Sequence, residues 1–391
     1  MKCIPVLVMA FLAVACASQP GAILRRTGAE IDAMAARAMT ATGAQGLAIA
    51  VVEEGQVRHV GAYGKRNAAG GSLQPQTVMY GASLTKAAFG YMVMQLVQEG
   101  KLDLDAPIAA YLPKPLPEYA SADIEDAYAR WSDLAGDDRW RRLTPRILLT
   151  HSSGFANFGF LEPDGKLKFH FDPGARYAYS GDGLILLQFV LERGLGLDVG
   201  AEMQRRVFDR FAMTDTSMIW RPDFAANLAE GWDANGAVEP HDERSAVRAS
   251  GSMDTTIADM ARFAAGYVSG EGLSRRGRAE LTRPLLAITT ATQFPSLQPE
   301  APPERRRADL AAGLGVIVFE GPLGRGFYKG GHNDTTGNTW VCVERGRRCV
   351  VILANDVRAE AAFPAIVAYV LGDTGAPWVW EYGDLKMWAP E

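Results

Sequence analysis

The sequence predicts an α+β protein whose sheet is built from both ends of the chain, with a helical insertion between them. Strand-like runs occur at residues 46–64 and again at 311–356, whereas helical patterns dominate from about 183 to 285. The chain has 391 residues, of which 48% are hydrophobic and 22% are charged. This length and composition allow one large domain or two intertwined ones.

The first elements follow from short local patterns. Residues 30–40 are rich in alanine and predict a helix. Residues 46–64 predict two strands joined by a turn at Glu54 and Gly55.

The next two segments predict a buried helix and a segment that lies over the core. The stretch 83–99 is apolar on nearly every side, which predicts a buried helix that ends at Gly100. Residues 112–145 are polar, aromatic and rich in proline, and they predict an insertion or lid over the core. We expect substrate specificity to lie in loops that include 114–142.

Strands return in the C-terminal third, and a helix follows them near residues 359–371. If Arg345 and Gly346 form a two-residue turn, Cys342 lies opposite Cys349, close enough for a disulfide. Two packed free thiols are the alternative. No zinc-ligand spacing surrounds these cysteines.

The N-terminus predicts export. Residues 1–17 combine a positive start, a short apolar run and the small residues Ala13-Val14-Ala15, which is the pattern of a signal peptide. The run is too short to span a bilayer as a permanent helix. Cys16 follows directly, which resembles a bacterial lipoprotein signal. We therefore expect a periplasmic protein, either tethered to the membrane by a lipid on Cys16 or freely soluble.

Composition argues against nucleic acid as a partner. The net charge is −5 and the basic residues are scattered, so no basic patch is apparent. The chain has no His-Glu-x-x-His motif, P-loop or complete dinucleotide fingerprint. We expect a small-molecule or short-peptide substrate, with neither a metal nor a cofactor.

A serine and a lysine three residues apart suggest a nucleophile with its base. On a helix Ser83 and Lys86 share a face, so their side chains can come within hydrogen-bond reach. At the helix start, the Ser83 oxygen also lies at the positive end of the helix dipole. Burial and a nearby cation both lower a lysine's pKa, which would let Lys86 accept a proton. The alternative is an N-capping serine followed by a solvated lysine.

Two further stretches carry candidate residues. Tyr179 stands at a glycine-rich turn before an apolar helix, where a phenol could relay protons. Lys329 ends a predicted strand, and Gly330-Gly331 allow backbone and ligand to approach closely. The alternatives are a core aromatic for Tyr179 and a surface position for Lys329.

In this order, the three stretches resemble the motifs of the serine β-lactamase and penicillin-binding-protein superfamily, specifically its class C-like branch of β-lactamase-related serine hydrolases. "GASLTK" at 81–86 is similar to the Ser-x-x-Lys box of that family. Tyr179-Ser180-Gly181 is similar to the Tyr-x-Asn box, and 329–331 to the Lys-Thr-Gly box.

The resemblance covers roughly residues 27–372 and leaves residues 373–391 as a C-terminal tail. It implies a β-lactamase-like antiparallel sheet flanked by helices, with an inserted helical domain. It makes Ser83 the nucleophile, Lys86 its basic partner and Tyr179 a proton relay. The backbone N–H groups of Ser83 and His332 would form the oxyanion hole. The residues that it implies for substrate binding and electrostatic stabilisation are Lys329, Gly330, Gly331, His332 and Asn333.

Two positions depart from the family pattern. Gly181 stands where β-lactamases and transpeptidases have an asparagine that bonds the substrate amide, and Gly330 replaces a hydroxyl residue near the substrate carboxylate. These changes argue against efficient β-lactam hydrolysis or transpeptidation, but they leave the nucleophile, base and oxyanion site intact.

The resemblance therefore implies a serine hydrolase that acts through an acyl-enzyme on an ester or amide, of the esterase or D-amino-acid peptidase type. A weak β-lactamase, a DD-carboxypeptidase and a catalytically silent module that binds cell-wall fragments are the alternatives. His151 and His332 do not indicate a Ser-His-Asp triad, because the chain has no Gly-x-Ser-x-Gly elbow. We expect His151 to have a structural role.

Overall fold

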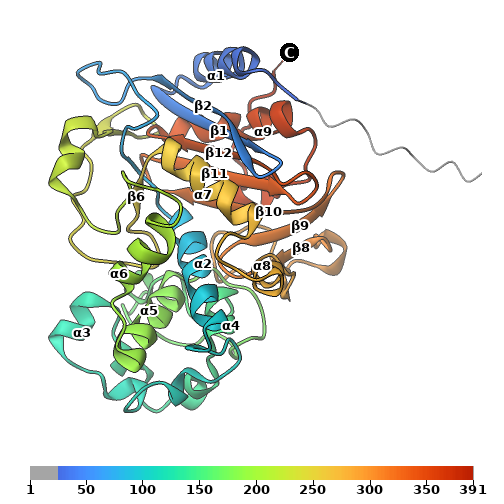
Figure 1. The fold of residues 1–391 in the computed structure, drawn as a ribbon. Helices are drawn as coiled ribbons and strands as arrows, with labels where there is room; N and C mark the ends of the chain where they lie inside the picture. The colour runs from blue at the N-terminus through green and yellow to red at the C-terminus, as the bar shows by residue number, and fades with distance from the viewer. Residues whose placement is uncertain (1–24, 391) are drawn as a thin grey trace, which may run out of the picture.

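An eight-stranded antiparallel sheet organises the protein (Figure 1). The computed structural model describes residues 25–390, apart from the side chain of Asp123, so the predicted leader at 1–17 with Cys16 lies outside the described residues. Both ends of the chain contribute strands, as the sequence predicts. In spatial order the strands are β2 (Gln56–Gly64), β1 (Gly46–Glu53), β12 (Arg348–Ala354), β11 (Gly337–Val343), β10 (Gly324–His332), β9 (Ile317–Gly321), β8 (Leu310–Ala312) and β7 (Leu286–Ala287).

Alternating side chains give the sheet two buried faces. The opposed pair Ile49 and Ile352 belongs to the core on one face, and the next pair, Ala50 and Val351, belongs to the core on the other. Helices cover both faces, which explains why β1 and β12 are apolar at successive positions. The covering helices are α1 (Gly28–Thr42) and α9 (Phe363–Leu371) on the first face, and α7 (Ile257–Ser269) on the second (Figure 1).

Two tight turns set the register of the outer and central strands. Glu54 and Gly55 have φ angles of 58° and 75°, so the predicted turn between β1 and β2 is confirmed in the left-handed conformation that such hairpins favour. The turn at Arg345 and Gly346 places Cys342 opposite Cys349 on β11 and β12. The structure joins these two residues in a disulfide, with an S–S distance of 1.99 Å.

A helical region lies below the sheet in Figure 1 and is built around α2 (Leu84–Gln98). Every residue of α2 from Leu84 to Leu96 is buried, which confirms the predicted core helix. The other helices of this region are α3 (Ala122–Ala127), α4 (Pro145–Leu149), α5 (Gly181–Leu195) and α6 (Val199–Met203). The helix α8 (Arg275–Leu281) lies beside the sheet instead, where the Leu281 carbonyl accepts from the Leu314 amide between β8 and β9 at 3.0 Å (Figure 1). Short strand pairs are β3 (Met79–Tyr80) with β6 (Asp254–Thr255), and β4 (Gly231–Trp232) with β5 (Val238–Glu239).

The region predicted to be mainly helical, 183–285, is helical only toward its two ends. Residues 214–256 form turns, short strands and a 3₁₀ helix, because proline, glycine and aspartate interrupt the apolar periodicity there. The predicted insertion at 112–145 consists of short helical turns. Its buried Trp131 and Trp140 anchor it to the core of the helical region.

Residues 373–390 belong to the segment expected as a C-terminal tail, and they include the helix α10 (Trp378–Tyr382). Trp380 packs against Tyr177, and Glu381 is buried. The aromatic residues of this helix bury against the sheet. Within residues 25–390, no helix combines the length and the apolar character that crossing a membrane requires.

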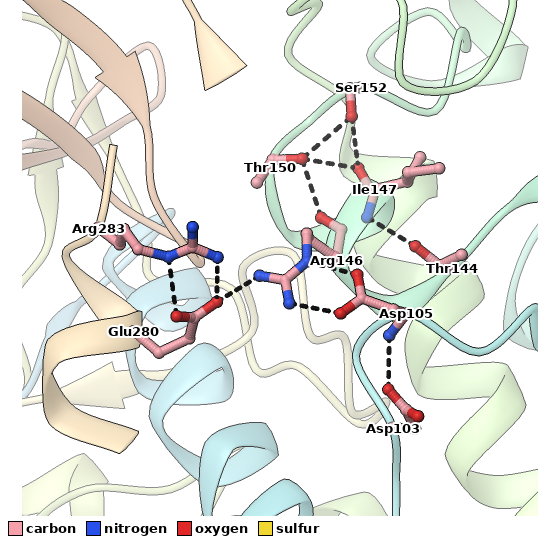
Figure 2. Close-up of polar contacts among 9 residues, drawn as sticks. All are labelled: Asp103, Asp105, Thr144, Arg146, Ile147, Thr150, Ser152, Glu280 and Arg283. Atoms are coloured by element: carbon pink, nitrogen blue, oxygen red, sulfur yellow. Dashed lines mark hydrogen bonds and ion pairs between the residues drawn. The ribbon is translucent and has the colours of Figure 1, made fainter. Parts of the chain in front are cut away.

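Arg146 of α4 ties the helical region to α8, as Figure 2 shows. Its guanidinium donates to both carboxylate oxygens of Asp105, at 2.6 and 2.7 Å, and also pairs with Glu280. At the end of α4, Thr150 Oγ1 donates to the Arg146 carbonyl at 2.8 Å and meets Ser152 Oγ at 3.0 Å. These bonds close the helix and lead into the left-handed residue His151, which has a φ of 52°.

We expect Arg146→Met to lower the free energy of unfolding by about 1–2 kcal/mol, since the bidentate pair is lost but Asp105 is largely solvated. Arg141→Met is the control, because Arg141 pairs with Asp138 at the surface and its loss should change stability by under about 0.5 kcal/mol. Urea unfolding measures both variants. Equal losses in the two variants would show that the Arg146 network adds nothing to stability.

Candidate active site

Ser83 is the N-cap residue of α2, but its side chain makes no capping hydrogen bond. Instead, Ser83 Oγ lies 2.9 Å from Lys86 Nζ and 2.7 Å from the Tyr179 hydroxyl. The preceding residue, Ala82, adopts a left-handed φ of 45°, so the chain turns sharply into the helix. The structure therefore brings the three predicted residues together and excludes the N-capping interpretation of Ser83.

Lys86 is buried in the core of the helical region. Besides Ser83, its amine donates to the Ser250 carbonyl oxygen at 2.5 Å. Burial lowers the pKa of Lys86 well below its ordinary value of 10.5, and the charge of Lys329 lowers it further. A neutral amine can donate to the Ser250 carbonyl while it directs its lone pair at the Ser83 hydroxyl.

Tyr179 is held by its stacking partner His151, with ring centroids 4.5 Å apart and planes at 24°. The Ser180 amide donates to His151 Nδ1 at 3.1 Å, and burial together with the charges of Lys86 and Lys329 lowers the His151 pKa well below its ordinary value. A neutral, fixed imidazole is consistent with the structural role expected for this residue. Burial also raises the pKa of Tyr179, so the phenol keeps its proton at rest.

The third predicted stretch lies on β10 beside the start of α2. Lys329 lies inside the strand rather than at its end, and its amine is 5.3 Å from the centroid of the Tyr179 ring. That amine donates to the Gly330 carbonyl at 2.8 Å, not to Ser83. Burial lowers the pKa of Lys329 to about 8, although Glu381 raises it in part. Lys329 thus supplies positive charge next to the phenol.

Gly331 allows β10 to approach the nucleophile. A Cβ atom at this position would lie 3.0 Å from the backbone nitrogen of Ser83. Among the described residues, the Ser83 amide has no backbone hydrogen-bond partner, whereas the amides of the next three residues are all bonded. An unpaired amide beside the nucleophile is what an oxyanion donor requires.

His332 and Asn333 follow the predicted stretch, and only the first of them lines the cleft. His332 lines the cleft, and its Nδ1 lies 3.1 Å from Glu360. Burial lowers the pKa of His332, but the hydrogen bond to Glu360 and the charges of Glu360 and Glu381 together raise it above the ordinary value. Asn333 lies outside this cleft, and its side chain accepts from the amides of Thr335 and Thr336. The Asn333 amide thus closes the turn after β10, and its expected contact with substrate stays a prediction.

Two residues that no sequence motif predicted, Phe158 and Glu381, lie against the glycines at positions 181 and 330. A Cβ on Gly181 would lie 2.3 Å from Phe158 Cε1, and a Cβ on Gly330 would lie 2.2 Å from Glu381 Oε1. Phe158 and Glu381 therefore occupy the space that larger residues would need. The glycines themselves were the only signal in the sequence, since neither neighbour belongs to a recognisable motif.

A cleft of about 1030 Å³ lies between the sheet and the helical region, and Ser83, Lys86, Tyr179, His332 and Glu381 are among the residues that line it. The cleft also receives side chains from the segment 125–133, so the predicted insertion forms one of its walls. Among the described residues, no cluster of three or more histidine, cysteine, aspartate or glutamate side chains could hold a metal ion. The arrangement offers a hydroxyl nucleophile, an amine base, a phenol and an unpaired amide at one point.

Comparison with known proteins identifies the family. Residues 31–371 match the Beta-lactamase family. The chain is 30% identical to the lovastatin esterase of Penicillium rubens over 43% of this chain and 48% of the esterase. It is 25% identical to D-alanyl-D-alanine-carboxypeptidase/endopeptidase AmpH of Escherichia coli K12, over 66% of each chain. The chain thus spans about half to two thirds of the length of these relatives.

The fold is similar to those of solved carboxypeptidase and penicillin-binding-protein structures. The D-alanine carboxypeptidase AmpC of Burkholderia cenocepacia superposes with a TM-score of 0.68, covering 88% of this chain and 97% of that one, at 18% identity. The penicillin-binding-protein homologue of Pyrococcus abyssi gives a TM-score of 0.66 at 17% identity, covering 87% and 76% of the two chains. With a family match over most of its length and the fold of these enzymes, the chain belongs to the Beta-lactamase family.

Proposed function

We propose that the protein is a serine hydrolase that cleaves an ester or amide through an acyl-enzyme, of the esterase or D-amino-acid peptidase type. One observation carries this proposal: Ser83 Oγ lies within 2.9 Å of a buried amine and 2.7 Å of a phenol, inside the cleft. The printed activities of the relatives, an esterase and a D-alanyl-D-alanine carboxypeptidase, support the same reaction class.

The geometry gives each group a part in the reaction. Neutral Lys86 takes the Ser83 proton as Oγ attacks the substrate carbonyl carbon, and the carbonyl oxygen becomes an oxyanion. The Ser83 amide, with that of His332 as the second expected donor, stabilises this oxyanion. The proton then passes through Tyr179 to the leaving oxygen or nitrogen, and the C–O or C–N bond breaks. Water then attacks the acyl carbonyl carbon, the bond between that carbon and Ser83 Oγ breaks, and the acyl group leaves as a carboxylic acid. The proton that the water loses returns through the same residues to Ser83 Oγ.

Lys329 supports this sequence through its charge. Its cation lowers the pKa of Lys86, which keeps the base neutral, and its position beside the Tyr179 ring stabilises negative charge that develops on the phenol oxygen. Lys329 reaches neither Ser83 nor Lys86 by a hydrogen bond, so its part is electrostatic.

A fluorophosphonate probe tests the proposed nucleophile. The probe should add covalent mass to the peptide that contains Ser83, and Ser83→Ala should abolish it. Lys86→Arg should lower the labelling rate at least ~100-fold while the protein still folds, because the guanidinium stays charged and cannot accept a proton. Intact-protein and peptide mass spectrometry measure both results.

Lys101→Arg is the matched control, since Lys101 is exposed and, within residues 25–390, its one ion pair is with Glu99. It should label at the wild-type rate. Wild-type labelling in Lys86→Arg would reject the base assignment. Absence of labelling in the folded wild type would reject the enzyme and leave the binding module as the remaining reading.

We also propose that the protein is exported. The leader pattern of residues 1–17 and the disulfide between Cys342 and Cys349 support an oxidising compartment outside the cytoplasm. When the full chain is produced in a Gram-negative host, the mature protein should begin at or near Cys16, and a lipid mass on Cys16 would identify the tethered form. A mature protein that retains Met1 would contradict export.

A further inference from the structure

Glu381 is a buried acid that the proposed reaction does not use. It lies on α10, and its side chain lines the cleft. Gln293 Nε2 donates to Glu381 Oε2 at 2.7 Å, and Gln293 in turn accepts from the Tyr177 hydroxyl at 3.1 Å. This chain of bonds fixes the carboxylate and leaves Oε1 directed at β10.

Oε1 lies beside Gly330, where a Cβ atom would come within 2.2 Å of it. Gly330 is one residue from Lys329 and one from Gly331, which adjoins the Ser83 amide. A substrate whose carbonyl oxygen points at that amide therefore carries its neighbouring groups along β10, past Glu381. In the family motif that residues 329–331 resemble, the residue at position 330 carries a hydroxyl donor. Here the carboxylate of Glu381, a hydrogen-bond acceptor, lies at that place instead.

None of the ion pairs within 4.0 Å among the described residues includes Glu381. Burial raises the pKa of Glu381, and the charges of His332 and Lys329 oppose this rise. A second carboxylate placed beside Gly330 would either be repelled by the ionised acid or force one of the two groups to take up a proton, and both outcomes cost free energy. An uncharged group would meet no such repulsion.

The rest of the cleft agrees with an uncharged substrate. Two of the arginines that line the cleft pair with carboxylates, Arg130 with Glu125 and Arg244 with Asp254, and the third, Arg248, donates to the Asp126 carbonyl. Large aromatic surface is exposed, since Phe160 stacks on Phe158 and is 73% exposed.

We propose that Glu381 makes the cleft selective for esters whose groups beside the scissile bond are uncharged and apolar, and that it excludes substrates carrying a carboxylate there. This inference rests on the proposed serine hydrolase activity. It favours the esterase type over a carboxypeptidase, whose substrate ends in a free carboxylate.

Two matched pairs of esters test the inference. Methyl 4-acetoxybenzoate and 4-acetoxybenzoate differ in charge on the leaving group, while methyl 4-nitrophenyl glutarate and mono-4-nitrophenyl glutarate differ on the acyl group. After correction for the alkaline hydrolysis rate of each ester, kcat/KM of the wild type should favour the uncharged member of at least one pair by about tenfold or more.

Glu381→Gln keeps the size of the side chain and removes its charge. It should reduce that ratio by about threefold or more, chiefly by raising kcat/KM for the charged ester. Glu243→Gln removes the same charge from an exposed residue of the cleft, away from Gly330, and should leave the ratio within about twofold of the wild type. Circular dichroism and the rate of fluorophosphonate labelling confirm that each variant is folded.

Equal kcat/KM values for the charged and uncharged members of both pairs would overturn the inference. A kcat/KM ratio that Glu381→Gln leaves unchanged would also overturn it, as would an equal reduction of that ratio by Glu243→Gln. If the proposed hydrolase activity itself is wrong, the wild type will hydrolyse none of the four esters and the fluorophosphonate will not label Ser83. Normal labelling with no discrimination by charge would reject the role of Glu381 alone.

Discussion

The rest of the site depends on the burial of one amine beside one hydroxyl. The polar contacts of Lys86 among the described residues are Ser83 Oγ and the Ser250 carbonyl, and neither carries a charge. An ammonium group in such a place is poorly compensated for the water it has lost, so its neutral form is favoured. The desolvation that makes Lys86 unfavourable for the core is therefore what enables it to act as a base.

The architecture maintains this arrangement from two sides. The sheet places Lys329 and Gly331 against the start of α2, while the helical region supplies Tyr179, stacked on His151. The tight turn at His151 follows from the end of α4, whose Arg146 network joins the two parts of the protein (Figure 2). The apolar surroundings of α2 keep water from Lys86, which links packing directly to the proposed chemistry.

The sequence predicted those features that depend on local spacing. Ser83 and Lys86 lie one helical turn apart, and the turn before Cys349 fixes its partner by register. Tyr179 and Lys329 are remote in sequence, and only their resemblance to family motifs placed them near Ser83. Glu381 could not be found in this way, because its position depends on how α10 packs after the expected end of the domain. The glycine at 330 indicated an altered site, but not which side chain would occupy the space.

The most direct test of this account is the titration of the Lys86 amine itself. In protein labelled with ¹³C at the lysine ε-carbons, NMR should show one resonance, absent from Lys86→Arg, with a pKa well below 10.5. Since the charge of Lys329 contributes to that shift, Lys329→Met should move the pKa of Lys86 upward. A Lys86 amine that titrates near 10.5 in the folded wild type would mean that the amine is charged at neutral pH, and it would contradict the role assigned to it.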